Sequence, residues 1–442
     1  MDAFWVESKE ATLRFMHAAD IHLGYQQYHS RARFDDFSRV FLTLVEQALT
    51  RQVDFLLLAG DLFEKRTVDP LAMRVAVEGL RMLRDAKIPV IAVEGNHEKA
   101  HYRDQYSWVD FLDGLGYLHL LNPRFEQGHA LLEPYGDEGG AYIDLPLGQA
   151  QGEPGSVRVY GLKYYGASTG KVFRLFADAL AETDHAGVDF SIVVAHAGLE
   201  GQIPRYSGTL THNDLAPLRE RIDYLALGHI HKPYTVEDWI YNPGSPETRS
   251  MDEVAWPERG CYLVEIEPGS PPGHRAEMIV PPRRPFHRLR LPVDALEEPN
   301  AVYDAIDELL RRRGHEIARD PAPVVELTLT GVLAFNRFDL DLDHVENIVQ
   351  EALSPLLVRV RNATTPAEFE ITVDVEASRP ELERSIVREL LERDARYRPA
   401  AEDWTRVALD VKRLALESST PEAMIDYLRR ARAELAAPGK GA

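Results

Sequence analysis

Apolar and polar positions follow two different periods along the first two thirds of the chain. Leu13 to Ala19 and Phe55 to Ala59 are short apolar runs of the length that buried strands have. Between them, Phe34 to Thr50 places apolar residues at the spacing of one helix face, and Pro70 to Asp85 predicts a second helix that starts with proline. Further strand-like runs are Ile88 to Val93, Ile192 to Ala195, Tyr224 to Leu227 and Tyr262 to Ile266. This alternation predicts a layered α/β domain.

The pattern changes twice further along the chain. Asn122 to Ser156 is rich in Gly, Pro and Glu, and we expect a long irregular excursion with short strands there. Prolines at Pro281, Pro282 and Pro285 then interrupt the alternation. Because domain boundaries fall in such segments, we expect residues 1–281 to form the first domain.

Two smaller parts follow the break. Residues 282–377 predict an α/β cap, and residues 378–442 predict a helical segment, with one helix starting at Ser419-Thr-Pro-Glu422. The apolar stripes of these last helices could dock on a coiled coil or close onto the cap, and the pattern leaves both open. In the cap we expect strands at Phe286 to Leu291, Val324 to Leu329, Leu356 to Val360 and Phe369 to Val375, and helices at Val302 to Leu310 and Leu342 to Val349.

Net charge, cysteine count and the length of the apolar runs each exclude some classes of protein. The formal net charge of −21 argues against a protein that holds nucleic acid by bulk electrostatics, unless local basic loops or a partner supply the contacts. Cys261 is the single cysteine, so an internal disulfide is excluded and a reducing cytoplasm is expected. No apolar run approaches the ~20 residues of a membrane span, and Met1 to Glu10 does not read as a secretory signal, so we expect no membrane partner.

Metal-binding residue types recur at the ends of the predicted strands, where α/β folds gather ligands. Residues two apart on an extended chain point the same way, so both members of each D-x-H or H-x-H pair can reach one cavity. Glycines before Asp61, Asn96 and His229 permit close approach of the backbone. The segments are Asp20-Ile-His22, Gly60-Asp61, Gly95-Asn-His-Glu98, His196 and Gly228-His-Ile-His231.

Each segment alone is weak, since a lone D-x-H or G-N-H is often a turn and a lone histidine is often a hydrogen-bonded core residue. Together, and each at a strand end, they predict a metal centre. Imidazole, carboxylate and amide oxygen suit Mn, Fe or Zn at two adjacent positions, which a carboxylate can bridge.

The order D-x-H, G-D, G-N-H-E, H, G-H-x-H resembles that of the calcineurin-like metallophosphoesterases, through about Pro281. Within that superfamily, Ala19 to Tyr25, Ala59 to Phe63 and Tyr241-Asn-Pro-Gly-Ser245 resemble the double-strand-break repair nuclease SbcD and its archaeal and eukaryotic relatives. The resemblance implies a metallophosphoesterase β-sandwich flanked by helices. The cap and the helical segment match that family by layout rather than by motif.

The resemblance also implies a set of site residues. One ion is expected at Asp20, His22, Asp61 and His231, and the other at Asp61, Asn96, His196 and His229. His97 matches a residue that does not bind metal and assists the leaving oxygen. We expect Glu64 to orient His97, the alternative being a solvated Glu64.

The expected function is therefore Mn²⁺-dependent hydrolysis of DNA at two metal ions; Fe, Zn or Mg remain possible. A coiled-coil ABC-type ATPase of the SbcC kind and a homodimer are implied, the latter through apolar residues near Tyr106, Trp108, Val109, Phe111 and Leu112. The chain has no G-x-x-x-x-G-K-[ST] loop of its own. We expect basic and aromatic loop residues to contact DNA, namely Tyr25, Arg31, Arg33, Lys65, Arg66, Lys99, Tyr102 and Arg103.

Two other functions are compatible with parts of this sequence. A phosphodiesterase or phosphatase for a small nucleotide or other small phosphate would share the site, but such enzymes are commonly compact, without a cap and helical tail. A degenerate, non-enzymatic scaffold would have lost one or more ligands, and no ligand is missing from this sequence.

Overall fold

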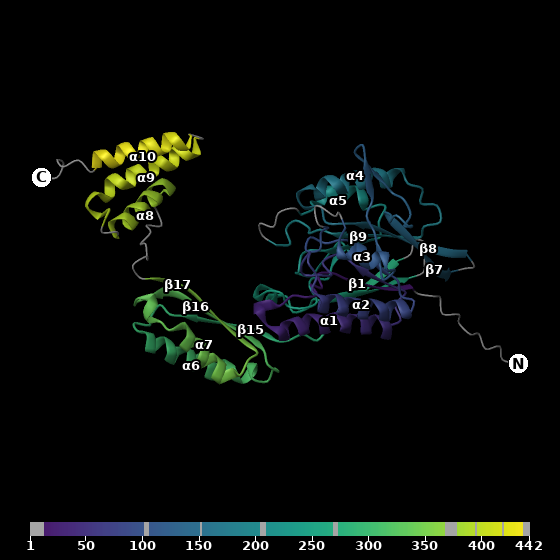
Figure 1. Ribbon diagram of the computed structural model, residues 1–442, viewed down its shortest axis with the longest axis horizontal. Helices are drawn as coiled ribbons and strands as arrows, with labels where there is room; N and C mark the ends of the chain where they lie inside the picture. The colour runs from purple at the N-terminus through teal and green to yellow at the C-terminus, as the bar shows by residue number, and fades with distance from the viewer. Residues whose placement is uncertain are drawn as a thin grey trace. The chain divides into compact units, whose positions relative to one another are not determined.

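The structure is a computed structural model, and it describes residues 13–100, 106–150, 153–203, 209–267, 273–366, 378–393, 396–417 and 420–435 (Figure 1). Contacts divide the chain into two compact units, Met1–Phe286 and His287–Ala442. The division lies close to the proline-marked break. Among the described helices, none is long and apolar enough to cross a membrane.

The first unit contains two six-stranded sheets. In the first sheet, β1 to β4 are parallel, β13 is antiparallel to β1, and β14 is antiparallel to β13. Its order is β14-β13-β1-β2-β3-β4. The bounds are β1 Leu13–Ala18, β2 Phe55–Leu58, β3 Val90–Ala92, β4 His119–Leu120, β13 Cys261–Glu267 and β14 Gly273–Ile279.

The second sheet has the order β11-β12-β10-β9-β8-β7. Its central strands β8, β9, β10 and β12 run parallel, and the edge strands β7 and β11 are antiparallel to their neighbours. The bounds are β7 Tyr142–Ala150, β8 Glu153–Leu162, β9 Phe190–His196, β10 Tyr224–Gly228, β11 Tyr234–Val236 and β12 Ile240–Asn242. A separate hairpin pairs β5 Arg124–Glu126 with β6 His129–Leu131.

The two sheets face each other across one apolar core. Phe15, Phe55 and Ile91 of the first sheet meet Ile192 and Tyr224 of the second, all buried. Helices α1 and α2 cover the outer face of the first sheet, and α4 covers that of the second (Figure 1). The helix bounds are α1 Arg31–Thr50, α2 Pro70–Asp85, α3 Trp108–Gly114, α4 Thr169–Glu182 and α5 His212–Leu215. The predicted β-sandwich flanked by helices is confirmed.

The prediction of an irregular excursion at Asn122 to Ser156 was wrong in part. The short strands that we expected are present as β5 and β6, but the last part belongs to β7 and the start of β8, which pair as a long antiparallel hairpin at the edge of the second sheet. β7 is an edge strand, where proline is tolerated, so Pro146 did not prevent pairing. Asp144 is exposed there, and this weakened the apolar signal.

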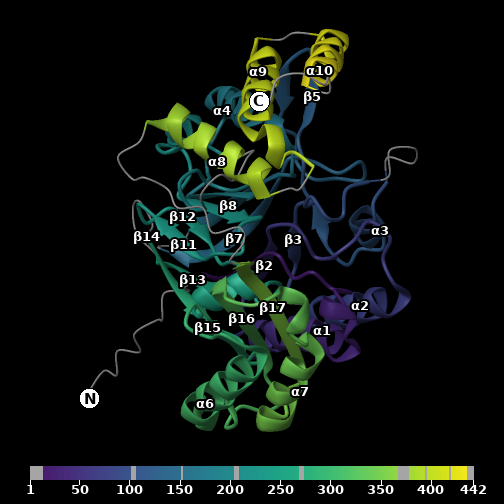
Figure 2. The same cartoon turned by 90° about the vertical axis from the view of Figure 1, so that its left-hand side faces the viewer.

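The second unit begins with a three-stranded sheet, β15-β16-β17. Helices α6 and α7 lie on the same side of it, as Figures 1 and 2 show, and Leu289, Val302, Leu327 and Val345 are among its core residues. The bounds are β15 Phe286–Pro292, α6 Pro299–Ile317, β16 Val324–Leu333, α7 Leu342–Leu353 and β17 Leu357–Pro366. The strand expected at Phe369 to Val375 lies outside the described residues.

Three helices follow, α8 Arg379–Arg393, α9 Ala401–Leu416 and α10 Pro421–Leu435. Ion pairs join α8 to α9, including Arg388 with Glu402 at 3.7 Å. The Tyr427 hydroxyl of α10 donates to Asp410 of α9 at 2.8 Å. Leu416 and Leu428 keep apolar surface exposed on this helical segment.

Candidate metal centre

The candidate ligands lie where the carboxyl ends of both sheets meet. Asp20 and His22 follow β1, Asp61 follows β2, and Asn96 follows β3. From the second sheet, His196 ends β9, and His229 and His231 follow β10. A cavity of about 420 Å³ opens beside them, lined by Asp61, Asn96, His97, His229, His231 and Arg249 among others.

Ligand atoms of these side chains converge. Three groups each bring their atoms within 4.8 Å of one another: Asp20 with His22 and His231, His22 with Asp61 and His97, and Asp20 with Asp61 and His196. Asp20, His22 and Asp61 each belong to two of the groups, so the three groups form one continuous cluster.

Individual distances fit the spacing of ligands around a cation. The Nε2 atoms of His22 and His231 lie 3.1 Å apart. His196 Nε2 lies 2.9 Å from Asn96 Oδ1 and 3.3 Å from Asp61 Oδ2. Two ligands each about 2.1 Å from one ion stand roughly 3 Å apart. The donor set of imidazole, carboxylate and amide oxygen therefore fits divalent metal ions.

The backbone at this site is strained. Asp20, His22 and Asp61 have φ between 53° and 54°, and His229 has φ of 88°. A non-glycine residue in this left-handed region carries a cost of about 1–3 kcal/mol, and such residues cluster at functional sites. This conformation lets the chain turn sharply after each strand, where the candidate ligand atoms gather.

Glycines permit the close approach of the strand ends. Gly60 has φ of 84°, and a Cβ there would stand 2.3 Å from the His196 ring. A Cβ at Gly95 would stand 2.1 Å from Asp61 Oδ1, and one at Gly228 would stand 2.1 Å from Ala59 O. The expectation that these glycines allow the backbone to approach closely is confirmed.

Two of the histidines, His196 and His231, are hydrogen-bonded through Nδ1, and His22 Nδ1 lies at ion-pair distance from a carboxylate. His22 Nδ1 lies 3.0 Å from Glu64 Oε2, and His231 Nδ1 lies 2.8 Å from Glu253 Oε1. His196 Nδ1 instead lies 2.7 Å from the carbonyl oxygen of Ala59. Such partners fix the orientation of a metal-binding imidazole.

Glu64 meets His97, although not as we expected. His97 Nδ1 donates to the main-chain carbonyl of Glu64 at 2.7 Å, while the Glu64 carboxylate is 3.9 Å away. The carboxylate faces His22 and accepts from Arg249 at 3.0 and 3.1 Å. Burial raises the pKa of Glu64, but His22 and Arg249 outweigh it and lower this pKa to about 2.

The electrostatics couple metal binding to proton release. Burial raises the pKa of Asp61, yet His196 outweighs it and holds this pKa well below its ordinary value. Burial lowers the pKa of His196, but Asp61 and Asp20 raise it to about 9. The pKa of His229 is lowered to about 3 by burial and by the charge of His196. His196 must therefore lose a proton before it can ligate a cation, whereas His229 is already neutral.

The predicted DNA contacts have different outcomes. Arg33 was a wrong prediction, because its side chain is fully buried and paired with Asp36 and Glu247. Tyr25 is half-buried beneath the Arg249 guanidinium, 5.2 Å from its ring centroid, and Lys99 lies over the Tyr164 ring at 4.4 Å. Three are exposed, namely Arg31, Lys65 and Arg66. Two lie outside the described residues, namely Tyr102 and Arg103.

Sequence reasoning missed Arg249 and Glu253. Both lie just after Tyr241-Asn-Pro-Gly-Ser245, a motif that carried the family resemblance but no assigned role. The Asn242 amide donates to the carbonyls of Ile230 and Lys232, on either side of His231, at 2.6 and 2.9 Å. The motif thus anchors the loop to a metal-ligand segment, which was the available signal.

Helix α3 divides the residues that we expected at a dimer contact. Val109 and Leu112 are buried in the core of the first unit. Tyr106, Trp108 and Phe111 are exposed, by 54%, 40% and 38%. Tyr106, Trp108 and Phe111 are therefore available to contact a partner, whereas Val109 and Leu112 are not.

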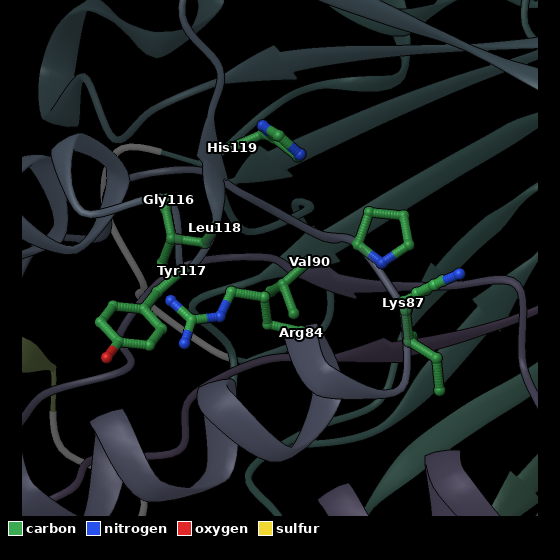
Figure 3. A pocket seen from close by; sticks show the side chains of 9 residues that line it. Arg84, Lys87, Val90, Gly116, Tyr117, Leu118 and His119 are labelled. Carbon is green, nitrogen blue, oxygen red and sulfur yellow. The ribbon is translucent and has the colours of Figure 1, made fainter.

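A second cavity lies at the opposite end of the first sheet (Figure 3). It holds about 180 Å³ beside Val90, where β3 begins, and the Arg84 guanidinium stands 4.6 Å from the Tyr117 ring centroid at its edge. The candidate ligands sit at the carboxyl end of β3, so this cavity takes no part in the metal centre.

Comparison with known proteins identifies relatives. Residues 13–233 match the calcineurin-like phosphoesterase family model. The DNA double-strand break repair protein Mre11 of Archaeoglobus fulgidus is 31% identical over 55% of this chain and 52% of its own length. The Mre11 proteins of Halobacterium salinarum and Aeropyrum pernix are 31% and 29% identical, over 72% and 68% of this chain and 70% and 68% of their own lengths.

The chain thus spans between about half and about two thirds of the length of these curated relatives. The matched family model begins at Leu13, the first residue of β1, and ends at Pro233, just beyond His231. All the candidate ligands therefore fall inside the matched region. The chain belongs to the calcineurin-like phosphoesterases, a family of metal-dependent hydrolases, and within them to the Mre11/SbcD family.

Proposed function

We propose that this protein is a Mn²⁺-dependent DNA nuclease of double-strand-break repair that hydrolyses phosphodiester bonds at a centre of two metal ions. The observation that carries the proposal is that ligand atoms of Asp20, His22, Asp61, His196 and His231 converge on one another, in a chain of the phosphoesterase family. One ion is assigned to Asp20, His22, Asp61 and His231, and the other to Asp61, Asn96, His196 and His229.

Bound divalent ions supply positive charge at the phosphate oxygens and a water molecule of lowered pKa. Asp61 lies between the two groups of ligands and keeps its charge because its pKa is low. Asn96 contributes an uncharged oxygen 2.9 Å from His196 Nε2. The strained backbone at Asp20 and His22 holds these side chains in place before any substrate arrives.

His97 is proposed to assist departure of the leaving oxygen. A carbonyl can only accept a hydrogen bond, so the bond from His97 to Glu64 O places a proton on Nδ1. Nε2 is then the nitrogen available to the substrate, and His97 lines the cavity. In its protonated form it can donate to the leaving oxygen.

DNA is proposed as the substrate because the relatives named above are DNA double-strand break repair proteins. The net charge of −21 means that phosphate contacts must be local. Arg31, Lys65 and Arg66 are exposed on segments that follow metal ligands, and they are the proposed contacts. The cap, residues 282–377, is proposed as a further DNA-binding domain.

Two protein partners are proposed. The exposed residues of α3, Trp108 and Phe111 among them, are assigned to a homodimer contact. The helical segment, residues 378–442, is proposed to dock on a coiled-coil ABC-type ATPase, through exposed residues such as Leu416 and Ile425. A cytoplasmic location is also proposed, because the single cysteine, Cys261, is buried and the chain needs no internal disulfide.

The test is digestion of linear double-stranded DNA with Mn²⁺, beside hydrolysis of bis-p-nitrophenyl phosphate. The expected result is metal-dependent cleavage of both substrates, with loss of DNA cleavage in His97→Ala. Cleavage of the small diester alone, even after addition of the ATPase, would favour the alternative of a small-molecule phosphodiesterase. Cleavage of neither substrate by a correctly folded protein would overturn the enzymatic assignment.

A further inference from the structure

Two histidines of one proposed metal position each have a buried carboxylate next to Nδ1. His22 and His231 face each other through their Nε2 atoms, 3.1 Å apart. Their Nδ1 atoms point away. His231 Nδ1 is hydrogen-bonded to Glu253 at 2.8 Å, and His22 Nδ1 lies 3.0 Å from Glu64 Oε2, an ion-pair distance without hydrogen-bond geometry. Glu253 therefore fixes the direction of His231 Nε2 through a hydrogen bond, whereas Glu64 restrains His22 through its charge and close contact.

A single residue joins these two carboxylates. The guanidinium of Arg249 donates to both oxygens of Glu64, from Nε at 3.1 Å and from Nη2 at 3.0 Å. The main-chain N–H of Arg249 donates to Glu253 Oε2 at 2.9 Å. The carboxylates are only 8% and 3% exposed, so water cannot replace these contacts fully.

We propose that Arg249 is a positioning residue for this metal position: its guanidinium acts through Glu64 on His22, and its main-chain N–H helps to hold Glu253 beside His231. The proposal rests on the proposed function, since it assumes that these histidines bind a cation. A bidentate arginine contact fixes the plane of a carboxylate as well as its place. With that plane fixed, the Glu64 oxygen that faces His22 keeps one direction, and so does the imidazole.

Buried side chains hydrogen-bond to the main chain around Arg249. Gln27 donates to the carbonyl of Arg249 at 2.8 Å and accepts from Arg33 Nε at 2.9 Å. Arg33 also donates to Thr248 O and to Glu247, both at 2.9 Å. This is the structural reason why Arg33 is buried rather than available to DNA, and it makes the loop around Arg249 a rigid support.

Substrate binding is the competing role for Arg249, because its side chain is 29% exposed and lines the cavity. The two roles differ in what they change. A residue that only contacts substrate alters KM and leaves metal affinity untouched. A positioning residue alters metal affinity in the absence of any substrate.

The experiment is Mn²⁺ titration by calorimetry on the metal-free full-length protein and on Arg249→Gln. We expect two binding events in the native protein, and in the variant a loss of about 10- to 100-fold in affinity at one of them. Arg158→Gln is the matched control, because Arg158 makes a bidentate pair with Asp144 that is also partly exposed. That control should bind both ions as the native protein does.

A double-mutant cycle with Glu64→Gln separates the route of the effect. If Arg249 acts through Glu64, the double variant should lose no more affinity than the weaker-binding single variant. Additive losses, or an Arg249→Gln variant with native Mn²⁺ affinity and only a raised KM for the small diester, would overturn the inference. A native protein that binds no divalent ion would overturn the proposed function itself.

Discussion

The two halves of the candidate centre orient their histidines by different means. At one half, His22 and His231 depend on the carboxylates of Glu64 and Glu253. At the other half, His196 is held by the carbonyl of Ala59, 2.7 Å away. A carboxylate adds negative charge and raises the basicity of its imidazole, whereas a carbonyl contributes only a dipole.

The difference also concerns how each half is assembled. The His196 half is made where strands of the two sheets end next to one another, so main-chain packing is sufficient. The His22 half needs Arg249 and Glu253, which come from a loop beyond the second sheet. One half therefore follows from the sandwich itself, and the other depends on a buried network of charged side chains.

The largest expected effect is at Asp61, which both halves share. Asp61→Asn removes a negative charge from each group of ligands, so both Mn²⁺ affinities should fall. Removing a partner of a ligand costs about 10- to 100-fold, and removing the shared ligand should exceed about 100-fold in hydrolysis of the small diester. Calorimetry with Mn²⁺ checks whether both events weaken, and a loss confined to one event would contradict a shared role.

The second prediction concerns Arg33, the buried residue whose ion pairs stabilise the loop around Arg249. Arg33→Gln leaves Asp36 and Glu247 buried with one cation fewer, so the free energy of unfolding should fall by about 3–5 kcal/mol. Denaturant unfolding measures this. The control is Arg31→Gln, an exposed neighbour whose loss should change stability by less than about 0.5 kcal/mol. Equal effects of the two variants would show that Arg33 is not structurally required.

The third prediction targets the His196 half, whose main-chain partner cannot be deleted. Gly60→Ala adds a Cβ 2.3 Å from the His196 ring, so it should weaken one Mn²⁺ event by about tenfold or more. Gly116→Ala is the control: Gly116 also has positive φ, and nothing lies within 4 Å of its added Cβ. Both variants should lose about 1–2 kcal/mol of stability from backbone strain. Native Mn²⁺ binding by Gly60→Ala would argue against the expected displacement of His196.

The connection between the halves has the smallest expected effect near neutral pH, and this effect grows only as the pH falls. His17 of β1 contacts the Tyr224 hydroxyl and the Leu227 carbonyl of β10, each at 3.0 Å, and burial lowers its pKa from 6.5 to about 3. The unfolded chain takes up this proton first, so the unfolding free energy should fall as the pH drops from 6.5 toward 3. One proton contributes at most about 1.4 kcal/mol per pH unit. His17→Gln should show a shallower slope in metal-free unfolding, and an identical slope would exclude His17 as its source.

Local periodicity explains which elements were predictable. The apolar face of α1 and the proline at the start of α2 are visible within a few residues, and the prediction of a helix at Pro70 to Asp85 is confirmed. The strand at the edge of the second sheet was missed because β7 gains its pairing from β8 and not from its own pattern.

The sequence by itself determined the family, the layered fold and the residues that carry candidate ligand atoms, because each motif is short and sits at the end of a strand. Only the tertiary structure decided their partners. Glu64 and Arg249 are 185 positions apart, and Arg33 and Glu247 are 214 apart. Whether a charged side chain faces solvent, DNA or another charge depends on which distant loop folds over it, and no local pattern of apolar and polar residues contains that information.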